Sequence, residues 1–77
     1  MLQVDLSKTD RELTQFIGAC CSPFGVVKSV KLERKPTPFA LIEMSTYHEM
    51  LELAAEYGGS AFGTSALIHL EQQSKTK

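Results

Sequence analysis

KPTPFALIEM, residues 35–44, is the stretch that decides the fold. Its last six residues, almost all apolar, have the character of a strand, in which successive side chains point to opposite sides of a sheet. Pro38 stands just before this strand, where its missing backbone N–H does least harm. We therefore predict a strand over residues 39–44. Its inward side chains would be Ala40, Ile42 and Met44, and its outward side chains would be Phe39, Leu41 and Glu43.

Three other segments also have the pattern of strands. Residues 2–6 alternate between apolar and polar side chains, which is typical of a half-buried strand. Residues 26–32 are rich in β-branched side chains and alternate over their second half. Residues 66–70, near the end of the chain, form a short and mostly apolar run that is consistent with a fourth strand. The sequence therefore predicts four strands in all.

Two helices are predicted between these strands. Residues 9–12 and 46–49 both have the spacing of a capping box, in which a threonine and a glutamate satisfy each other's backbone N–H groups. Pro23 ends the first helix, and Gly58 ends the second by taking a left-handed conformation without a Cβ penalty. The expected core faces are Leu13, Phe16, Ile17, Cys20 and Cys21 in the first helix and Met50, Leu53, Ala54 and Tyr57 in the second.

The order of elements is strand, helix, strand, strand, helix, strand, which is the ferredoxin-like split βαβ order. We predict an α+β fold, a βαββαβ sandwich with a four-stranded antiparallel sheet and both helices on one face. The first and third strands would lie in the middle of the sheet. Residues 1–71 would form this domain, and residues 72–77 would form a polar C-terminal tail.

Composition excludes several classes of function. The chain has 77 residues, so one domain is expected. Its net charge of -1 does not by itself indicate a nucleic-acid-binding protein. Cys20 and Cys21 are adjacent and have no His or Cys partner at the spacing of metal ligands, so we expect no disulfide, metal or cofactor. Free cysteines of this kind indicate a reduced, intracellular setting, which we expect to be the cytoplasm, with the nucleus left open. No apolar run is long enough for a membrane span, and nothing at the start has the pattern of a signal peptide. We expect no catalytic residues. Small phosphatases of similar topology need an asparagine in the third strand, and the chain has no asparagine. The two histidines lie on different predicted elements, so they are not expected to meet.

The side of the sheet that carries no helix is the expected functional surface. At its centre Phe39 and Leu41 would face solvent, and a small domain does not expose such a pair on a central strand without a use or a cover. Gln3 is expected beside this pair, with Lys31 on one flank and Leu67 and His69 on the other. Further basic residues lie in the loop before residues 39–44 and at the end of the chain: Arg34, Lys35, Lys75 and Lys77.

From about Leu2 to Glu71 the chain resembles the RNA recognition motif family. The segment 38–44 is similar to that family's longer motif, on its third strand, and residues 2–6 are similar to its short first-strand motif. Further points of similarity are the aromatic-glycine step at residues 24–27, the helix end at 54–59 and the glycine-led entry to the last strand at 63–68. This resemblance implies an RRM-like fold and contact with single-stranded RNA.

The resemblance also implies a reduced stacking platform. In that family, aromatic residues at one first-strand position and two third-strand positions stack on unpaired bases. Phe39 keeps its aromatic ring at the matching position, whereas Leu41 and Gln3 replace the other two. Thr37 and Pro38 stand where the longer motif has a basic residue and a glycine. Since each stacked base contributes roughly 1–3 kcal/mol, modest affinity is expected.

Two classes of function follow. The first is a module that binds single-stranded RNA through Gln3, Lys31, Arg34, Lys35, Phe39, Leu41, Leu67 and His69. The second is a protein-interaction module, in which Phe39, Leu41 and Leu67 meet a partner chain, a second copy or the C-terminal tail. Peptide-binding members of the family carry an Arg-x-Phe before the last strand, but residues 60–62 read SAF without the arginine, so Phe62 is expected to fill the core.

Overall fold

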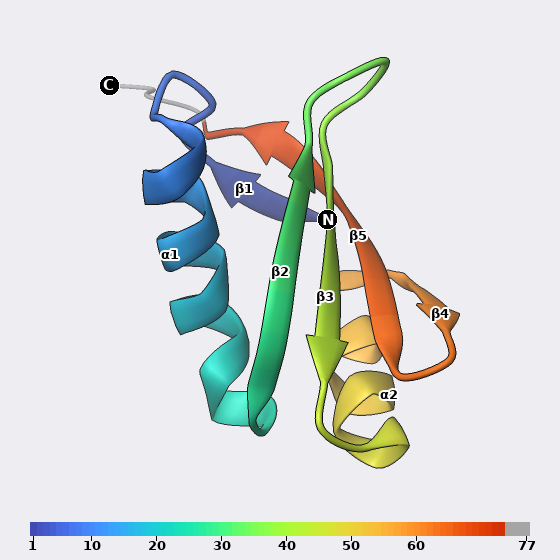
Figure 1. Ribbon diagram of the computed structural model, residues 1–77. Coiled ribbons are helices and arrows are strands. Elements are labelled where there is room, and N and C mark those ends of the chain that lie inside the picture. The colour runs from blue at the N-terminus through green and yellow to red at the C-terminus, as the bar shows by residue number, and fades with distance from the viewer. Residues whose placement is uncertain (74–77) are drawn as a thin grey trace.

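The computed structural model describes residues 1–73 and shows a small α+β fold with two helices and a five-stranded mixed sheet (Figure 1). The strands are β1 Leu2–Val4, β2 Val27–Glu33, β3 Phe39–Met44, β4 Ser60–Phe62 and β5 Ser65–Gln72. The helices are α1 Asp10–Cys21 and α2 Tyr47–Tyr57, and a short 3-10 helix, η1 Ser22–Phe24, follows α1. Neither α1 nor α2, the α-helices of this described part, has the length and apolar character needed to cross a membrane.

The strands lie side by side in the order β1–β5–β3–β2, and β4 pairs with β5 on the same edge as β1. The β2–β3, β3–β5 and β4–β5 pairs are antiparallel, whereas β1 and β5 are parallel. It follows that β4 runs parallel to β3 with β5 between them. The connection through α2 therefore forms a split βαβ unit from β3, α2 and β4.

The expected four-stranded antiparallel sheet with the first strand in the middle is wrong. The sheet has five strands and one parallel pair, β1 lies at an edge, and β5 lies beside β3. The reason is the hairpin formed by β4 and β5, where the sequence predicts only a loop before the last strand. The chain turns back through residues 63–64, and this turn reverses the direction of the last strand. Gly63 allows this turn with a φ of 62°, the left-handed conformation that two-residue hairpin loops favour.

The last strand extends two residues past its predicted end at Leu70. The strand β5 continues to Gln72, whose side-chain oxygen accepts a hydrogen bond from the backbone N–H of Leu6 at 3.0 Å. The backbone N–H of Gln73 donates to the carbonyl of Val4 at 2.7 Å. Parallel pairing with β1 thus keeps Gln72 and Gln73 in the fold, because their backbone groups find partners there.

The core lies between one face of the sheet and both helices, as alternation predicts. All of the predicted inward side chains of β3 and β5 are buried, and within residues 1–73 no helix covers the other side of the sheet (Figure 1). No buried polar or charged residue occurs among residues 1–73. The buried apolar residues are Leu2, Val4, Leu13, Ile17, Cys21, Ala40, Ile42, Met44, Met50, Leu53, Ala54, Ala66, Ile68 and Leu70.

The start of α1 is the predicted capping box. The hydroxyl of Thr9 accepts from the N–H of Glu12 at 3.2 Å, and the Glu12 carboxylate accepts from the N–H of Thr9 at 3.0 Å. These hydrogen bonds, the one from the Thr9 backbone first, lower the pKa of Glu12. The prediction that Phe16 belongs to the core face is wrong, because its side chain is 47% exposed.

The start of α2 keeps only half of its predicted box. The hydroxyl of Thr46 accepts from the N–H of Glu49 at 3.2 Å, but the Glu49 carboxylate accepts from the hydroxyl of Ser45 at 2.6 Å. At the other end Gly58 takes the predicted left-handed conformation, with a φ of 67°. Both ends of the helix are therefore defined by local hydrogen bonding and backbone geometry.

Candidate nucleic-acid interface

The helix-free side of the sheet, called the open face below, is built from rows of side chains on neighbouring strands. Residues that pair directly across two strands point to the same side of a sheet. Three such rows cross the open face, namely Glu33–Phe39–His69, Lys31–Leu41–Leu67–Ser60 and Ser29–Glu43–Ser65–Phe62. Phe39 and Leu41 of β3 therefore stand next to His69 and Leu67 of β5.

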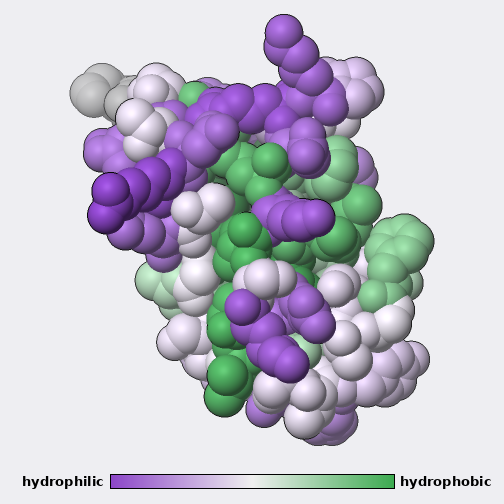
Figure 2. Space-filling view, in the orientation of Figure 1, coloured by the Kyte–Doolittle hydropathy of each residue, from purple (hydrophilic) through white to green (hydrophobic). Residues whose placement is uncertain are grey.

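An apolar patch, defined as Phe39, Leu41 and Leu67, occupies the middle of these rows. All three side chains are half-buried by their neighbours, and none of them belongs to the buried core. Figure 2 shows apolar surface along the middle of this view, with hydrophilic side chains crossing and bordering it. The predicted outward orientation of these three residues is thus confirmed, and the patch leaves apolar surface within reach of a ligand.

Gln3 does not lie beside Phe39, contrary to the prediction. It is exposed on the edge strand β1, where it pairs with Glu71 of β5. The whole of β5 separates it from β3, because β1 is not a central strand. Gln3 therefore belongs to the margin of the open face and cannot share one stacked base with Phe39.

Carboxylates outnumber cations on the open face. Glu33 and Glu43 stand in its rows, and Glu71 follows His69 two residues later on β5 and so points to the same side. Lys31 is the one lysine within the three rows, opposite Leu41. Since phosphates are held mainly by lysine and arginine, the centre of this face can neutralise about one phosphate.

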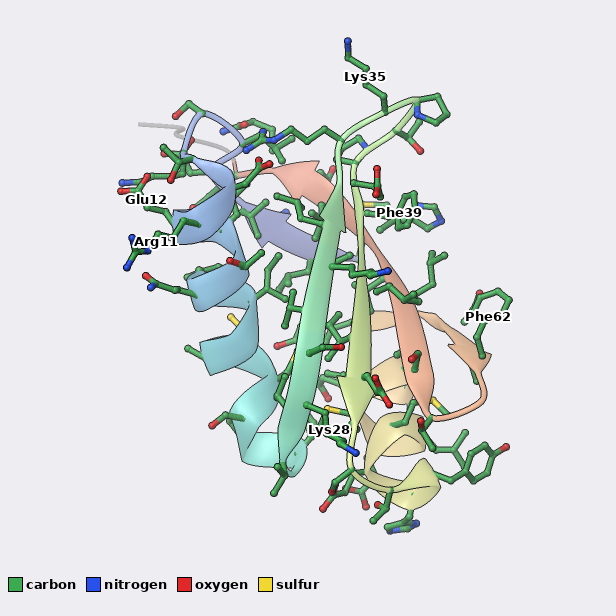
Figure 3. All side chains as sticks on the ribbon, in the orientation of Figure 1. Arg11, Glu12, Lys28, Lys35, Phe39 and Phe62 are labelled. Atoms are coloured by element: carbon green, nitrogen blue, oxygen red, sulfur yellow. The ribbon has the colours of Figure 1, made fainter. Side chains whose placement is uncertain are left out.

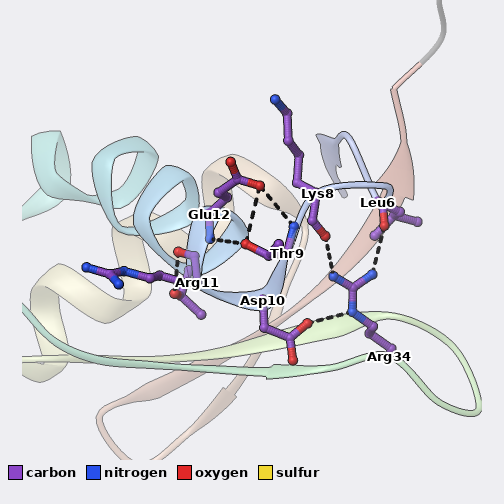
Figure 4. Close-up of polar contacts among 8 residues, drawn as sticks. Leu6, Lys8, Thr9, Asp10, Arg11, Glu12 and Arg34 are labelled. Carbon is purple, nitrogen blue, oxygen red and sulfur yellow. Dashed lines mark hydrogen bonds and ion pairs between the residues drawn. The ribbon is translucent and has the colours of Figure 1, made fainter.

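Arg34 serves the fold rather than the open face. Its Nε donates to the Asp10 carboxylate at 2.7 Å, and its two terminal nitrogens donate to the carbonyls of Leu6 and Lys8, both at 2.8 Å (Figure 4). The guanidinium thus ties the end of β2 to the loop between β1 and α1. A phosphate would have to displace these intramolecular hydrogen bonds, so Arg34 is a poor phosphate ligand here.

Two further lysines lie near the ends of β2. Lys35 is exposed in the β2–β3 loop and points away from the sheet, and Lys28 lies near the opposite end of β2 (Figure 3). Lys75 and Lys77, the basic residues noted near the end of the sequence, lie outside the described residues. Among the predicted cations within residues 1–73, the structure therefore brings Lys31 alone close to the apolar patch.

Phe62 is a residue of the open face that sequence reasoning placed in the core. Its side chain is 59% exposed, and it stands opposite Ser65 at the end of β4, at the edge of the sheet (Figure 3). A signal for this was present, because a glycine-containing pair, Gly63–Thr64, separates two short runs with strand character. Interpreting that pair as a hairpin turn would have placed Phe62 on a strand.

A cavity of about 390 Å³ lies elsewhere, beside the first turn of α1. It shares no residue with the rows of the open face. Two of its carboxylates are already hydrogen-bonded, Asp5 to Ser7 and Glu12 to Thr9. Its lining residues are Asp5, Lys8, Glu12, Leu13, Phe16 and Gln73.

The thiols do not form a reactive site. Both Cys20 and Cys21 are free, and burial raises the pKa of each. The pKa of Cys21 reaches about 11, chiefly through burial and further through repulsion from Cys20. Because the thiolate is the nucleophile, a thiol of this kind is inert near neutral pH. No group of three or more His, Cys, Asp or Glu side chains that could hold a metal ion occurs within residues 1–73.

Comparison with known proteins adds no further constraint to this geometry. No protein-family model matches the chain, and neither a curated protein nor a solved structure matches it.

Proposed function

We propose that the chain is a single-stranded RNA-binding module of the RNA recognition motif kind, which holds bases on the open face of its sheet. The observation that carries this proposal is the apolar patch, in which the Phe39 ring lies beside Leu41 and Leu67 on the helix-free side. Unpaired bases stack on such rings and contact such aliphatic side chains. One stacked base contributes about 1–3 kcal/mol, so a single ring supports modest affinity.

Two polar residues complete the proposed contact. His69 is exposed directly opposite Phe39, where its ring nitrogens can hydrogen-bond to the edge of the stacked base. Lys31 stands in the next row, opposite Leu41, and is placed to meet a phosphate of the same strand. Gln3 has no part in this contact, because β5 separates it from Phe39. Arg34 has no part either, because its guanidinium donates hydrogen bonds to the β1–α1 loop.

The same proposal relates the fold to the ferredoxin-like arrangement. The β3–α2–β4 unit supports this relation, since its two parallel strands enclose β5 as in a split βαβ unit. The strands β1 and β2, which α1 connects, are also parallel to each other. On this view the β4–β5 hairpin is an addition that brings the last strand to the centre of the sheet.

Removing the ring of Phe39 tests the proposal. Fluorescence anisotropy with a fluorescein-labelled RNA octamer of random sequence, at about 50 mM salt, measures the affinity. We expect Phe39→Ala and Phe39→Leu to weaken binding at least about fivefold, since both remove a stacked base worth about 1 kcal/mol or more. Leu51→Ala, an exposed position on α2, is the control and should leave the affinity unchanged.

Two results would contradict the proposal. One is the absence of any binding by the unchanged protein at millimolar concentration. The other is equal binding by the unchanged protein and by Phe39→Leu, which keeps the apolar packing and loses only the ring.

A protein partner is the second candidate, and one observation favours it. Glu33, Glu43 and Glu71 border the apolar patch and repel a phosphate backbone, whereas a basic protein surface would complement them. Sedimentation at rising concentration distinguishes the self-pairing form of this candidate. A monomer at every concentration would remove that form.

A further inference from the structure

We infer that Phe62 is a second base-stacking position, so that one RNA strand crosses the open face diagonally from Phe39 over Leu67 to Phe62. This inference rests on the proposed function and specifies the path and the length of the RNA that the face would hold.

The register of the strands places all three side chains on one side of the sheet. Leu67 and Ser65 belong to the outward set of β5, because Ala66 and Ile68 between and beyond them are fully buried. Phe62 pairs directly with Ser65 across the β4–β5 hairpin and therefore points to the same side. The ring thus shares the open face with Phe39.

Packing does not explain the position of the Phe62 ring. It is 59% exposed and belongs neither to the buried core nor to the partly buried apolar residues that pack against the core. Two other exposed rings, Phe16 and Tyr47, lie on the helices. Among the exposed large apolar residues of the described chain, Phe62 alone stands in a row of the open face.

The spacing of the two rings defines a footprint. Phe39 and Phe62 lie two strand steps apart across the sheet and four residues apart along β5, which is about 17 Å in total at ordinary strand dimensions. Bases that follow one another at the duplex spacing of about 3.4 Å would cover that distance in five steps, and an extended strand needs fewer. A single RNA strand of about six nucleotides is therefore long enough to contact both rings.

The distribution of charge favours this diagonal over a path along β3. Between the two rings the diagonal crosses Leu67 and Ser65, and β4 itself carries no charged residue. A strand that followed β3 beyond Leu41 would run directly over the carboxylate of Glu43, whereas the diagonal passes that carboxylate one strand away, at Ser65. A phosphate backbone meets less repulsion on the diagonal.

A length series tests the inference. Fluorescein-labelled RNAs of random sequence, two to eight nucleotides long, are titrated into the unchanged protein, Phe62→Ala and Tyr47→Ala. Tyr47 is the matched control, because it is an aromatic residue of almost equal exposure on α2, away from the open face. We expect Phe62→Ala to bind the octamer about tenfold more weakly, since one stacked base is lost.

The same series shows whether both rings hold one strand. For the unchanged protein, affinity should rise with length up to about six nucleotides, whereas for Phe62→Ala it should stop rising at a shorter length. Tyr47→Ala should follow the unchanged protein throughout.

Failure of the inference differs from failure of the proposed function. If the unchanged protein and Tyr47→Ala bind RNA, Phe39→Leu does not, and Phe62→Ala binds like the control, Phe62 has no role in stacking. If Phe62→Ala instead alters only self-association in sedimentation, the ring serves a protein contact and the inference is overturned. If no RNA binds at all, the proposed function fails first.

Discussion

At the scale of single residues, the sequence pattern was most reliable where a side chain's place depends on its immediate neighbours. Alternation placed Phe39, Leu41 and Leu67 on the open side and their neighbours in the core, because the two-residue period is local to one strand. Sequence pattern failed for Arg34, which we predict from its basic neighbours to contact RNA. The acceptors of that guanidinium lie 24 to 28 residues away along the chain, and no local pattern reveals them.

The role assigned to Arg34 predicts a cost in stability rather than in binding. We expect Arg34→Ala to lower the free energy of unfolding by about 1–2 kcal/mol, because two backbone carbonyls lose a charged donor. Asp10→Asn should cost less than about 1 kcal/mol, since that ion pair is largely exposed. Urea unfolding measures both. Equal stability of Arg34→Ala and the unchanged protein would contradict this role.

The buried thiol of Cys21 predicts a stability loss in base. Its pKa is about 11 in the fold and 9.0 as an ordinary thiol, so between these values the unfolded chain loses a proton that the folded chain keeps. Stability contributed by this group is therefore full below pH 9 and falls as pH rises toward 11, by roughly 1.4 kcal/mol per pH unit. Urea unfolding from pH 8 to 10.5 should show this slope in the unchanged protein. Cys21→Ala should lack this component, and an identical pH dependence in both proteins would contradict it.

At the scale of elements, the helices were predicted well and the strand neighbours were not. Capping, proline and glycine signals act within a few residues, so both helices begin and end close to the expected positions. The order of strands depends on which segments meet across the whole chain. One missed hairpin, β4–β5, was enough to move β1 from the centre to the edge and to separate Gln3 from Phe39.

Two glycines with opposite backbone requirements test that hairpin. Gly63 has a φ of 62° in the turn, so Gly63→Ala should destabilise the fold by about 1 kcal/mol, although the added methyl group would meet no described residue beyond its chain neighbours within 4 Å. Gly63→Asn should cost less, because asparagine tolerates this conformation. Gly18→Ala, inside α1 and equally free of clashes, should instead stabilise by up to about 1 kcal/mol. Thermal unfolding that shows the same sign for both alanine variants would contradict the assigned turn.

At the scale of the whole molecule, charge limits how RNA can be held. The chain has a net charge of -1, and the open face offers Lys31 among three carboxylates. We therefore expect binding to depend on stacking and only weakly on salt. The logarithm of the affinity should fall with the logarithm of salt concentration with a slope of about -0.7 to -1.4, which corresponds to one or two phosphates on a single strand. A slope steeper than about -3 would mean that cations away from the open face dominate.

The central claim is that the open face, and no other surface, contacts RNA, and an NMR titration tests it most directly. Backbone amide signals of the labelled protein are followed while a random-sequence RNA octamer is added at low salt. The account predicts that signals of residues 39–41 and 65–69 move progressively, while those of α1 and α2 stay in place. Unchanged signals from the sheet at high RNA excess, or shifts confined to α1 and the cavity beside it, would contradict the account.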